Sequence, residues 1–278
     1  MRPAPLTEPL DEGLFGGKAA QLATAVRAGL PVPAGVALPV AFVDAIAAHR
    51  RDARRELAEI SRGLRAPLVA RSSAIGEDSE QASFAGQHVT RLNVLSAREL
   101  AETVCAIWSS ARSPSALAYR ARLGLPSEPS MAVVVQELVD ADSAGVLFSR
   151  NPLDGSDELV IEGAWGLGEA VVAGLVTPDR FRLARDGAVL ARAAGVKDVA
   201  VRTDPGGGTR QIEVPRELAC SLCLDDSQLA ALHALALRCD DVFGQSSDLE
   251  WAFAGGRVYL LQRRALTAIP STPMAANA

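Results

Sequence analysis

The stretch PLVARSSAIGEDSEQASFAGQHVTRLNV, residues 67–94, decides how the rest of this chain is organised. Its apolar residues 68–70 predict a short strand, which delivers Arg71 into a segment of small and hydroxyl-bearing residues. Arginine offers a planar fork of donors, and small residues let backbone N–H groups approach a phosphate. The stretch therefore indicates an anion site. The alternative is a surface loop in which Arg71 pairs with a nearby carboxylate, Glu77 or Asp78.

Composition and charge exclude several classes of protein. The 278 residues include 28 basic and 33 acidic side chains, which give a net charge of −5 and no electrostatic footprint for nucleic acid. The sequence has neither a leader-like start nor an apolar run of about 18 residues, so we expect no membrane segment and a cytoplasmic location. Four cysteines in a chain of this length fit a reducing compartment.

A Gly-Gly-Lys triplet, residues 16–18, precedes a helical pattern that ends near Gly29. At a helix start, free N–H groups, the positive end of the helix dipole and the Lys18 ammonium can converge on a phosphate. The spacing is not that of a Walker loop, because the glycines are adjacent and neither Ser nor Thr follows the lysine. A simple loop-to-helix junction is the alternative.

The middle of the chain predicts helices, buried strands and hairpins. Helical patterns cover residues 41–64, residues 96–124 with a break at Pro114, and residues 225–243; strands are expected at residues 131–139, 144–149 and 158–162, and antiparallel hairpins within residues 181–213. The apolar strand 131–139 suits burial on both faces and includes the polar pair Gln136 and Glu137, which can read an adenine edge. A core strand whose Gln136 caps a turn is the alternative. The Gly-rich residues 163–169 suit either a phosphate cradle or a tight strand-to-helix turn.

The last element predicts a metal-binding face. In residues 248–253, apolar side chains alternate with carboxylates, one of which is Glu250. An odd-numbered turn at residues 255–257 puts Glu250 opposite Gln262, with Arg264 two residues further along the same face. A carboxylate and an amide carbonyl are hard ligands for magnesium, and a guanidinium can hold a phosphoryl group. The alternative is a solvated hairpin face with a surface ion pair.

Five segments together resemble the ATP-binding domain of phosphoenolpyruvate synthase, pyruvate phosphate dikinase and rifampin phosphotransferase. In the order of that family they are GGKAAQLATAVRAGLPVPAG, VARSSAIGEDSEQASFAGQHVTRLNV, VVVQELVDADSAGVLFSRNP, EGAWGLGEAVVAGLVTPDRF and DLEWAFAGGRVYLLQRR. The resemblance implies an α+β, ATP-grasp-like fold with two lobes, mixed or antiparallel sheets, flanking helices and a nucleotide cleft between the lobes. It implies an N-terminal lobe of residues 1–95 with the phosphate-binding loop, and a C-terminal lobe of residues 96–278 with the adenine- and magnesium-binding elements.

Carried over by motif, the resemblance implies a site for ATP and Mg²⁺. The implied contacts are Lys18, Arg71, Gly86 and Thr90 for the phosphates, Gln136, Glu137 and Val139 for the adenine, Glu250 and Gln262 for magnesium, and Arg264 for the transferring phosphoryl group. Three of these residues, Lys18, Arg71 and Arg264, are implied to act in catalysis.

A departure from the family bears on function. The family typically runs on into a domain with a phosphate-carrying histidine preceded by serine, whereas none of the three histidines here follows a serine. We therefore expect an ATP-dependent phosphotransferase that phosphorylates a histidine on a separate carrier protein and leaves AMP. One alternative is a self-contained kinase or ligase that acts on a small molecule and releases ADP; another is a non-catalytic nucleotide-binding subunit. The complete set of implied phosphate and metal contacts argues against the last.

Overall fold

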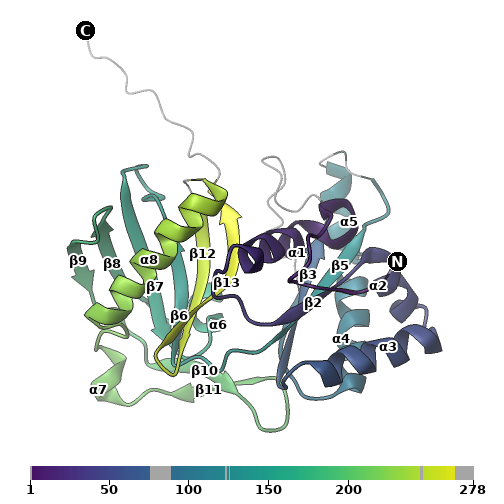
Figure 1. The fold of residues 1–278 in the computed structure, drawn as a ribbon. Coiled ribbons are helices and arrows are strands. Elements are labelled where there is room, and N and C mark those ends of the chain that lie inside the picture. Colours follow the sequence, from purple (N-terminus) through teal and green to yellow (C-terminus); the bar gives the residue numbers. More distant parts are fainter. Residues whose placement is uncertain (1, 76–88, 123, 125, 245–246, 267–278) are drawn as a thin grey trace.

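The computed structural model describes residues 2–75, 89–122, 124, 126–244 and 247–266. They form an α+β fold of antiparallel sheets with flanking helices (Figure 1). The helices are α1 (Glu12–Arg27), α2 (Val40–Ala47), α3 (Arg51–Gly63), α4 (Ala97–Ser110), α5 (Pro114–Arg122), α6 (Glu169–Val172), α7 (Arg216–Ala219) and α8 (Asp226–Phe243). The strands are β1 (Ala4–Pro5), β2 (Gly35–Leu38), β3 (Leu68–Ala74), β4 (Thr90–Val94), β5 (Met131–Glu137), β6 (Ser143–Phe148), β7 (Glu158–Trp165), β8 (Asp179–Ala184), β9 (Val189–Ala193), β10 (Val199–Thr203), β11 (Thr209–Glu213), β12 (Ser247–Ala254) and β13 (Arg257–Ala265). Within the described ranges, no helix combines the length and apolarity that crossing a bilayer requires.

β5 is the centre of the first sheet, whose strand order is β1-β2-β5-β3-β4. Its Val133 and Val135 pack in a core that α2, α3 and α4 share, whereas Val134 packs with α1 residues on the opposite face. Because helices cover both faces, this strand needs no polar alternation, and the unbroken valine run is explained. The buried strand expected from the sequence is confirmed over Met131–Glu137.

The second sheet has the strand order β13-β12-β6-β7-β8-β9. α8 lies across one of its faces, where Leu232 belongs to the same core as Trp251 and Phe253 (Figure 1). α8 starts where the sequence predicts, because the Asp225 carboxylate accepts the Gln228 N–H at 2.8 Å and the Gln228 side chain accepts the Asp225 N–H at 2.9 Å. The opposite face of this sheet lines the space between the two sheets.

A two-stranded ribbon, β10–β11, contacts both larger sheets. Near the end of β4, Asn93 Nδ2 donates to the carbonyls of Asp204 and Gly208 at the ribbon's turn, at 2.6 and 2.7 Å. On the other side, the Leu167 N–H donates to the Val201 carbonyl at 2.9 Å. Asn93 has a φ of 58°, a left-handed conformation that asparagine tolerates better than most residues. The ribbon thus spans from the first sheet to the turn after β7.

The chain passes from the first sheet to the second between β5 and β6 and not at residue 95. The sequence puts residues 96–278 in the second lobe, yet β5 pairs with both β2 and β3 of the first sheet, and α4 packs on that sheet. Local periodicity could not reveal this, because strand pairing joins segments far apart in the chain. The helix expected over residues 41–64 is likewise divided into α2 and α3, since His49 takes a left-handed φ of 57°.

The Gly-rich residues 163–169 form the end of β7 and a tight turn into α6. A Cβ on Gly163 would come within 2.9 Å of the Trp251 indole, so glycine lets β7 continue past this ring. Gly166 has a φ of 82°, and its N–H donates to the Asp142 carbonyl at 2.9 Å. Because the chain itself engages this N–H and that of Leu167, the strand-to-helix turn is the alternative that the structure adopts.

Candidate nucleotide-binding site

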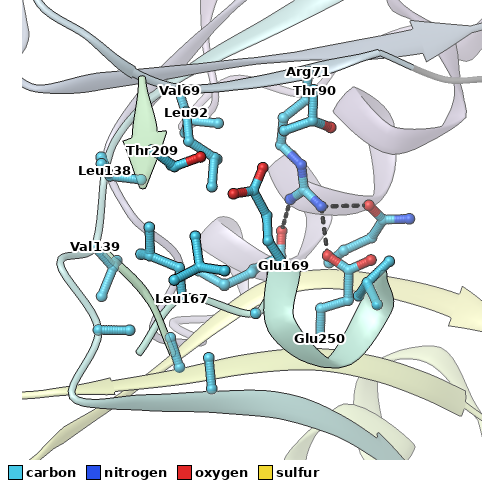
Figure 2. Close-up of a pocket in the computed structure, with 18 of the residues that line it drawn as sticks. Val69, Arg71, Thr90, Leu92, Leu138, Val139, Leu167, Glu169, Thr209 and Glu250 are labelled. Carbon is cyan, nitrogen blue, oxygen red and sulfur yellow. Dashed lines mark hydrogen bonds and ion pairs between the residues drawn. The ribbon is translucent and has the colours of Figure 1, made fainter. Parts of the chain in front are cut away.

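A cavity of about 840 Å³ lies between the two large sheets. Its volume falls in the range of small-molecule sites, about 300 to 1,000 Å³. One end is apolar, and the side chains converging there include Val69, Leu92, Leu138, Val139 and Leu167 (Figure 2). The other end carries charged and amide side chains. A cavity with one apolar end and one charged end suits a ligand that joins a flat ring system to an ionic group.

Arg71 of β3 crosses the charged end to reach the β12–β13 hairpin. Its Nη2 donates to Glu250 Oε2 and to Gln262 Oε1, each at 2.6 Å, and its Nη1 donates to the Leu261 carbonyl (Figure 2). Alternation along β3 sets this direction, because Ala70 packs in the core beneath α4 and Arg71 therefore faces the other way. Three side chains that the sequence predicts in one cleft are thus brought together.

A β-bulge determines which side chains of β13 face the cavity. The turn between Ala254 and Arg257 holds two residues and not the odd number expected. The register shifts by one residue at Leu261, and beyond the shift Glu250 pairs with Gln262. The expected pairing of these two residues is therefore confirmed, although a bulge within the strand produces it and the turn does not.

Lys18 is buried beside the charged end, with 5% of its surface exposed. Its Nζ donates to the Ser72 carbonyl of β3 at 2.7 Å. α1 kinks at Gly16, whose φ is 79° and where a Cβ would lie 2.2 Å from the Ser73 carbonyl oxygen. Just beyond the kink, the Ala19 N–H donates to Ser73 Oγ at 3.1 Å. Glycine is needed for α1 to approach β3 this closely, and the approach brings Lys18 to the cavity.

Neighbouring cations keep the Glu250 carboxyl ionised. Burial alone raises its pKa, but Arg71, then Arg264 and Lys18, outweigh burial and hold the pKa below its ordinary value. Asp248 lies two residues away on the same face, and burial together with Glu250 raises its pKa to about 6 against the opposing effect of Arg264. Asp248 Oδ1 is buried and accepts no hydrogen bond from the described residues. No role was expected for Asp248 from the sequence, although alternation places it beside Glu250.

Two further residues border the charged end, one expected to contact the phosphates and one expected to hold the transferring phosphoryl group. Thr90 of β4 lies opposite Arg71 in the strand register and lines the cavity. Arg264 of β13 also lines the cavity and lies opposite Asp248 in the register. Gly86 falls outside the residues that the structure describes.

The adenine candidates lie where β5 ends, at the border of the apolar end. Gln136, Glu137 and Val139 all line the cavity. Gln136 is buried, however, and its Nε2 donates to the Pro33 carbonyl at 3.1 Å, so this amide nitrogen already has a partner. Glu137 accepts the Arg65 N–H at 3.0 Å, which ties its carboxylate to the segment before β3.

Glu169 is a cavity residue that sequence reasoning missed. It is the first residue of α6, and its carboxylate points into the cavity on the side of Arg71 (Figure 2). The signal was the Gly-rich turn itself, because a strand-to-helix turn at the border of a cavity directs the first helical side chains toward it. Thr209 of the β10–β11 ribbon lines the apolar end in the same view and was also not predicted.

Comparison with known proteins identifies the family to which this sequence is similar. Residues 36–277 match the family described as pyruvate phosphate dikinase, AMP/ATP-binding domain. A probable phosphoenolpyruvate synthase of Methanothermobacter thermautotrophicus is 35% identical over 93% of this chain and 45% of its own length. A rifampicin phosphotransferase of Streptomyces sviceus is 35% identical over 77% of this chain and 25% of its own length. Among solved structures, an L-amino acid ligase of Bacillus licheniformis aligns at 12% identity with a TM-score of 0.42, covering 91% of this chain and 43% of that one.

The chain spans less than half the length of these curated relatives, 45% of one and 25% of the other. The matched residues 36–277 contain Arg71, Glu250 and Gln262, which meet at the charged end of the cavity. The chain belongs to the pyruvate phosphate dikinase AMP/ATP-binding domain family.

Proposed function

We propose that this chain binds ATP with magnesium between its two sheets and transfers a phosphoryl group from ATP to a histidine on a separate carrier protein. The observation that carries the proposal is the convergence of Arg71 with Glu250 and Gln262 at the charged end of an apolar cavity. A nucleotide matches this polarity, because its base is flat and apolar on its faces while its phosphates are anionic. Family membership supports the nucleotide.

The side chains of the charged end would act by positioning and by charge. Lys18, Arg71 and Arg264 supply three cations around the volume where the phosphates would lie. Arginine forks can hold a phosphoryl group through two parallel hydrogen bonds. Because Lys18 and Arg71 are buried, their interactions are stronger than they would be at an exposed surface. Base contacts would come from the apolar end, where Leu138 and Val139 line the cavity.

The donor set at the hairpin fits a magnesium ion. Glu250 offers a carboxylate and Gln262 an amide carbonyl, and hard oxygen ligands of this kind suit Mg²⁺. The buried Asp248 Oδ1, which accepts no hydrogen bond from the described residues, offers a further oxygen on the same face. Bound there, magnesium would neutralise phosphate charge and orient the transferring group. We propose that Glu250 and Gln262 bind the magnesium ion.

A separate carrier is supported by what surrounds the cavity. Of the two histidines that the structure describes, His49 lies between α2 and α3 and His233 lies on α8, and neither lines the cavity. His233 Nε2 is instead 2.9 Å from the Arg185 carbonyl. Because neither described histidine lines the cavity, we propose an acceptor histidine outside the described residues, on a separate carrier.

Labelled ATP tests the proposal directly. The purified chain is incubated with Mg²⁺ and ATP labelled at the β-phosphate, with and without a candidate carrier encoded by an adjacent reading frame that holds a Ser-His element. We expect AMP, an acid-labile label on the carrier histidine, and unlabelled inorganic phosphate, because the γ-phosphoryl group passes to water. ADP formed without any partner would instead establish a self-contained kinase. Tight ATP binding without turnover under either condition would establish a nucleotide-binding subunit.

A substitution in the β12–β13 hairpin tests the proposed magnesium site. Glu250→Gln keeps the size of the side chain but removes the charge proposed to hold magnesium, so we expect turnover to fall by about 100-fold or more. The thermal unfolding midpoint checks that the fold survives. Glu213→Gln is the control, because Glu213 is exposed on β11 outside the cavity. Equal losses in both variants would contradict the assignment of Glu250.

A further inference from the structure

One guanidinium nitrogen holds both oxygens that the proposed metal site requires. Arg71 Nη2 lies 2.6 Å from Glu250 Oε2 and 2.6 Å from Gln262 Oε1, while Nη1 donates to the Leu261 carbonyl. Arg71 is 8% exposed and the Glu250 side chain is 26% exposed, so this contact is partly buried and is not a loose surface pair. The guanidinium therefore stands in the position of a cation that bridges a carboxylate and an amide carbonyl.

A divalent metal and this arginine conformation exclude each other. Magnesium binds oxygen ligands at about 2.1 Å in near-octahedral geometry, so an ion held by both Glu250 and Gln262 must occupy space that Nη2 now fills. Two positive charges a few ångströms apart in a partly buried site also repel each other strongly. The charged end cannot relieve the repulsion, because Lys18 and Arg264 already add two cations around Glu250.

A polyanion resolves the conflict. A triphosphate offers Arg71 oxygen acceptors that match its fork at least as well as Glu250 and Gln262 do. Arg71 can turn to the phosphates from its place on β3, and the two hairpin oxygens then become available for the metal that accompanies the nucleotide. Thr90, opposite Arg71 in the strand register, borders the space into which the side chain would move.

We infer that Arg71 is the resident cation of the metal site and that nucleotide phosphate exchanges it for the divalent ion. The inference rests on the proposed function and names how that same site is regulated. The free chain accordingly binds a divalent ion weakly at Glu250 and Gln262. Metal and nucleotide bind with positive coupling, and linkage requires that each raises the affinity for the other by the same factor. Arg71 thus ensures that the metal ligands are exposed when phosphates are present to be neutralised.

Manganese binding without nucleotide provides the test. Mn²⁺ serves as the probe, and electron paramagnetic resonance counts the free ion during titration of the whole chain. We expect weak binding by the wild-type chain and at least tenfold tighter binding by Arg71→Gln, because the blocking cation is gone while Glu250 and Gln262 remain. The double variant Arg71→Gln, Glu250→Gln should lose this gain, which locates the ion at the hairpin.

A second arginine is the matched control. Arg182 Nη2 also contacts a buried glutamate, Glu158, at 2.7 Å, but it lies on β8 outside the cavity. We expect Arg182→Gln to bind Mn²⁺ as weakly as the wild-type chain. Far-ultraviolet circular dichroism of each variant confirms that it is folded, and Arg71→Lys, which retains a cation without the fork, should give an intermediate gain.

Adding a non-hydrolysable ATP analogue separates this inference from the proposed function. With the analogue present, wild-type Mn²⁺ binding should tighten by at least tenfold, whereas Arg71→Gln should gain less because its block is already removed. If folded Arg71→Gln and Arg71→Lys bind Mn²⁺ no more tightly than the wild-type chain, while the wild-type chain binds the analogue, the exchange is wrong and the ATP site stands. If the wild-type chain binds no analogue, the proposed function itself fails.

Discussion

At the scale of single residues, the site depends on how closely α1 approaches β3. Gly16 and Ser73 are so near that a Cβ on Gly16 would lie 2.2 Å from the Ser73 carbonyl oxygen. That approach lets Lys18 reach the Ser72 carbonyl beside Arg71. Gly16, which has no side chain, therefore sets the position of Lys18, which the proposed function needs. The Gly-Gly-Lys triplet indicated a phosphate contact, but the reason for its first glycine is packing against the neighbouring strand.

Gly16→Ala tests this packing. The new methyl group would meet backbone in a left-handed conformation, so we expect the free energy of unfolding to fall by at least about 2 kcal/mol. ATP affinity should weaken as well, because Lys18 moves with α1. Chemical denaturation and calorimetric titration measure the two effects. Gly63→Ala is the control, since Gly63 ends α3 and has open space around it, and the change should alter stability by less than about 1 kcal/mol.

Alternation predicted which polar side chains share a face of the β12–β13 hairpin, and the family resemblance implied that Arg71 belongs to the same site. Arg71 of β3 was expected in one cleft with Glu250 and Gln262 of the β12–β13 hairpin. The hydrogen bonds from Arg71 to both residues show that the three side chains meet. Two residues were missed for different reasons, one lining the cavity and one beside it. Asp248 shared the predicted face but was given no role, and Glu169 comes from a turn whose direction depends on packing that a local pattern does not contain.

At the scale of elements, the β10–β11 ribbon is the part that local patterns described least completely. Its hairpin was expected from its turn residues, and the pairing of Thr203 with Thr209 agrees. Its position was not foreseeable, because Asn93 holds it from a strand more than 100 residues earlier, with sequence separations of 111 and 115. The division of residues 41–64 into two helices was hidden similarly, since the left-handed His49 leaves no signature in hydrophobic periodicity.

Asn93→Gly isolates the role of the side chain that holds the ribbon. Glycine accepts the φ of 58° without strain, so the loss is confined to the two hydrogen bonds from Asn93 Nδ2. We expect a loss of about 1 to 3 kcal/mol in stability, because two partly buried hydrogen bonds are removed, each worth about 0.5 to 1.5 kcal/mol. The KM for ATP should rise, since Thr209 of the ribbon lines the cavity. An unchanged KM together with reduced stability would restrict the ribbon to a structural role.

At the scale of the whole molecule, the cavity belongs to both sheets and to neither alone. Arg71 belongs to the first sheet, and its three acceptors belong to the hairpin of the second. α1 packs on the first sheet and also touches β13, so it is a second connection between the two (Figure 1). The family resemblance implied two lobes and a cleft, but long-range pairing decided that β5 joins the first sheet.

Nucleotide binding should therefore stabilise the molecule as one unit. At an ATP concentration about 100 times its Kd, linkage contributes about 2.7 kcal/mol to the free energy of unfolding. For a chain of this size we expect the unfolding midpoint to rise by roughly 5 to 10 °C. Differential scanning calorimetry with ATP and Mg²⁺ measures the shift, and Glu250→Gln should show a smaller one. A scan in which part of the transition stays in place would mean that the ligand contacts a single sheet.

The extra residue in β13 decides which side chains of this hairpin face the ligand. If β13 alternated regularly from the same two-residue turn and kept all its residues, Leu261 would lie opposite Glu250. Gln262 and Arg264 would then face α8, although every side chain needed for the chemistry would still be encoded. Replacing Gly255 and Gly256 by another two-residue turn leaves that count untouched. The tip of the hairpin is thus free to diverge in composition, whereas the site requires that β13 accommodate its extra residue between the turn and Gln262.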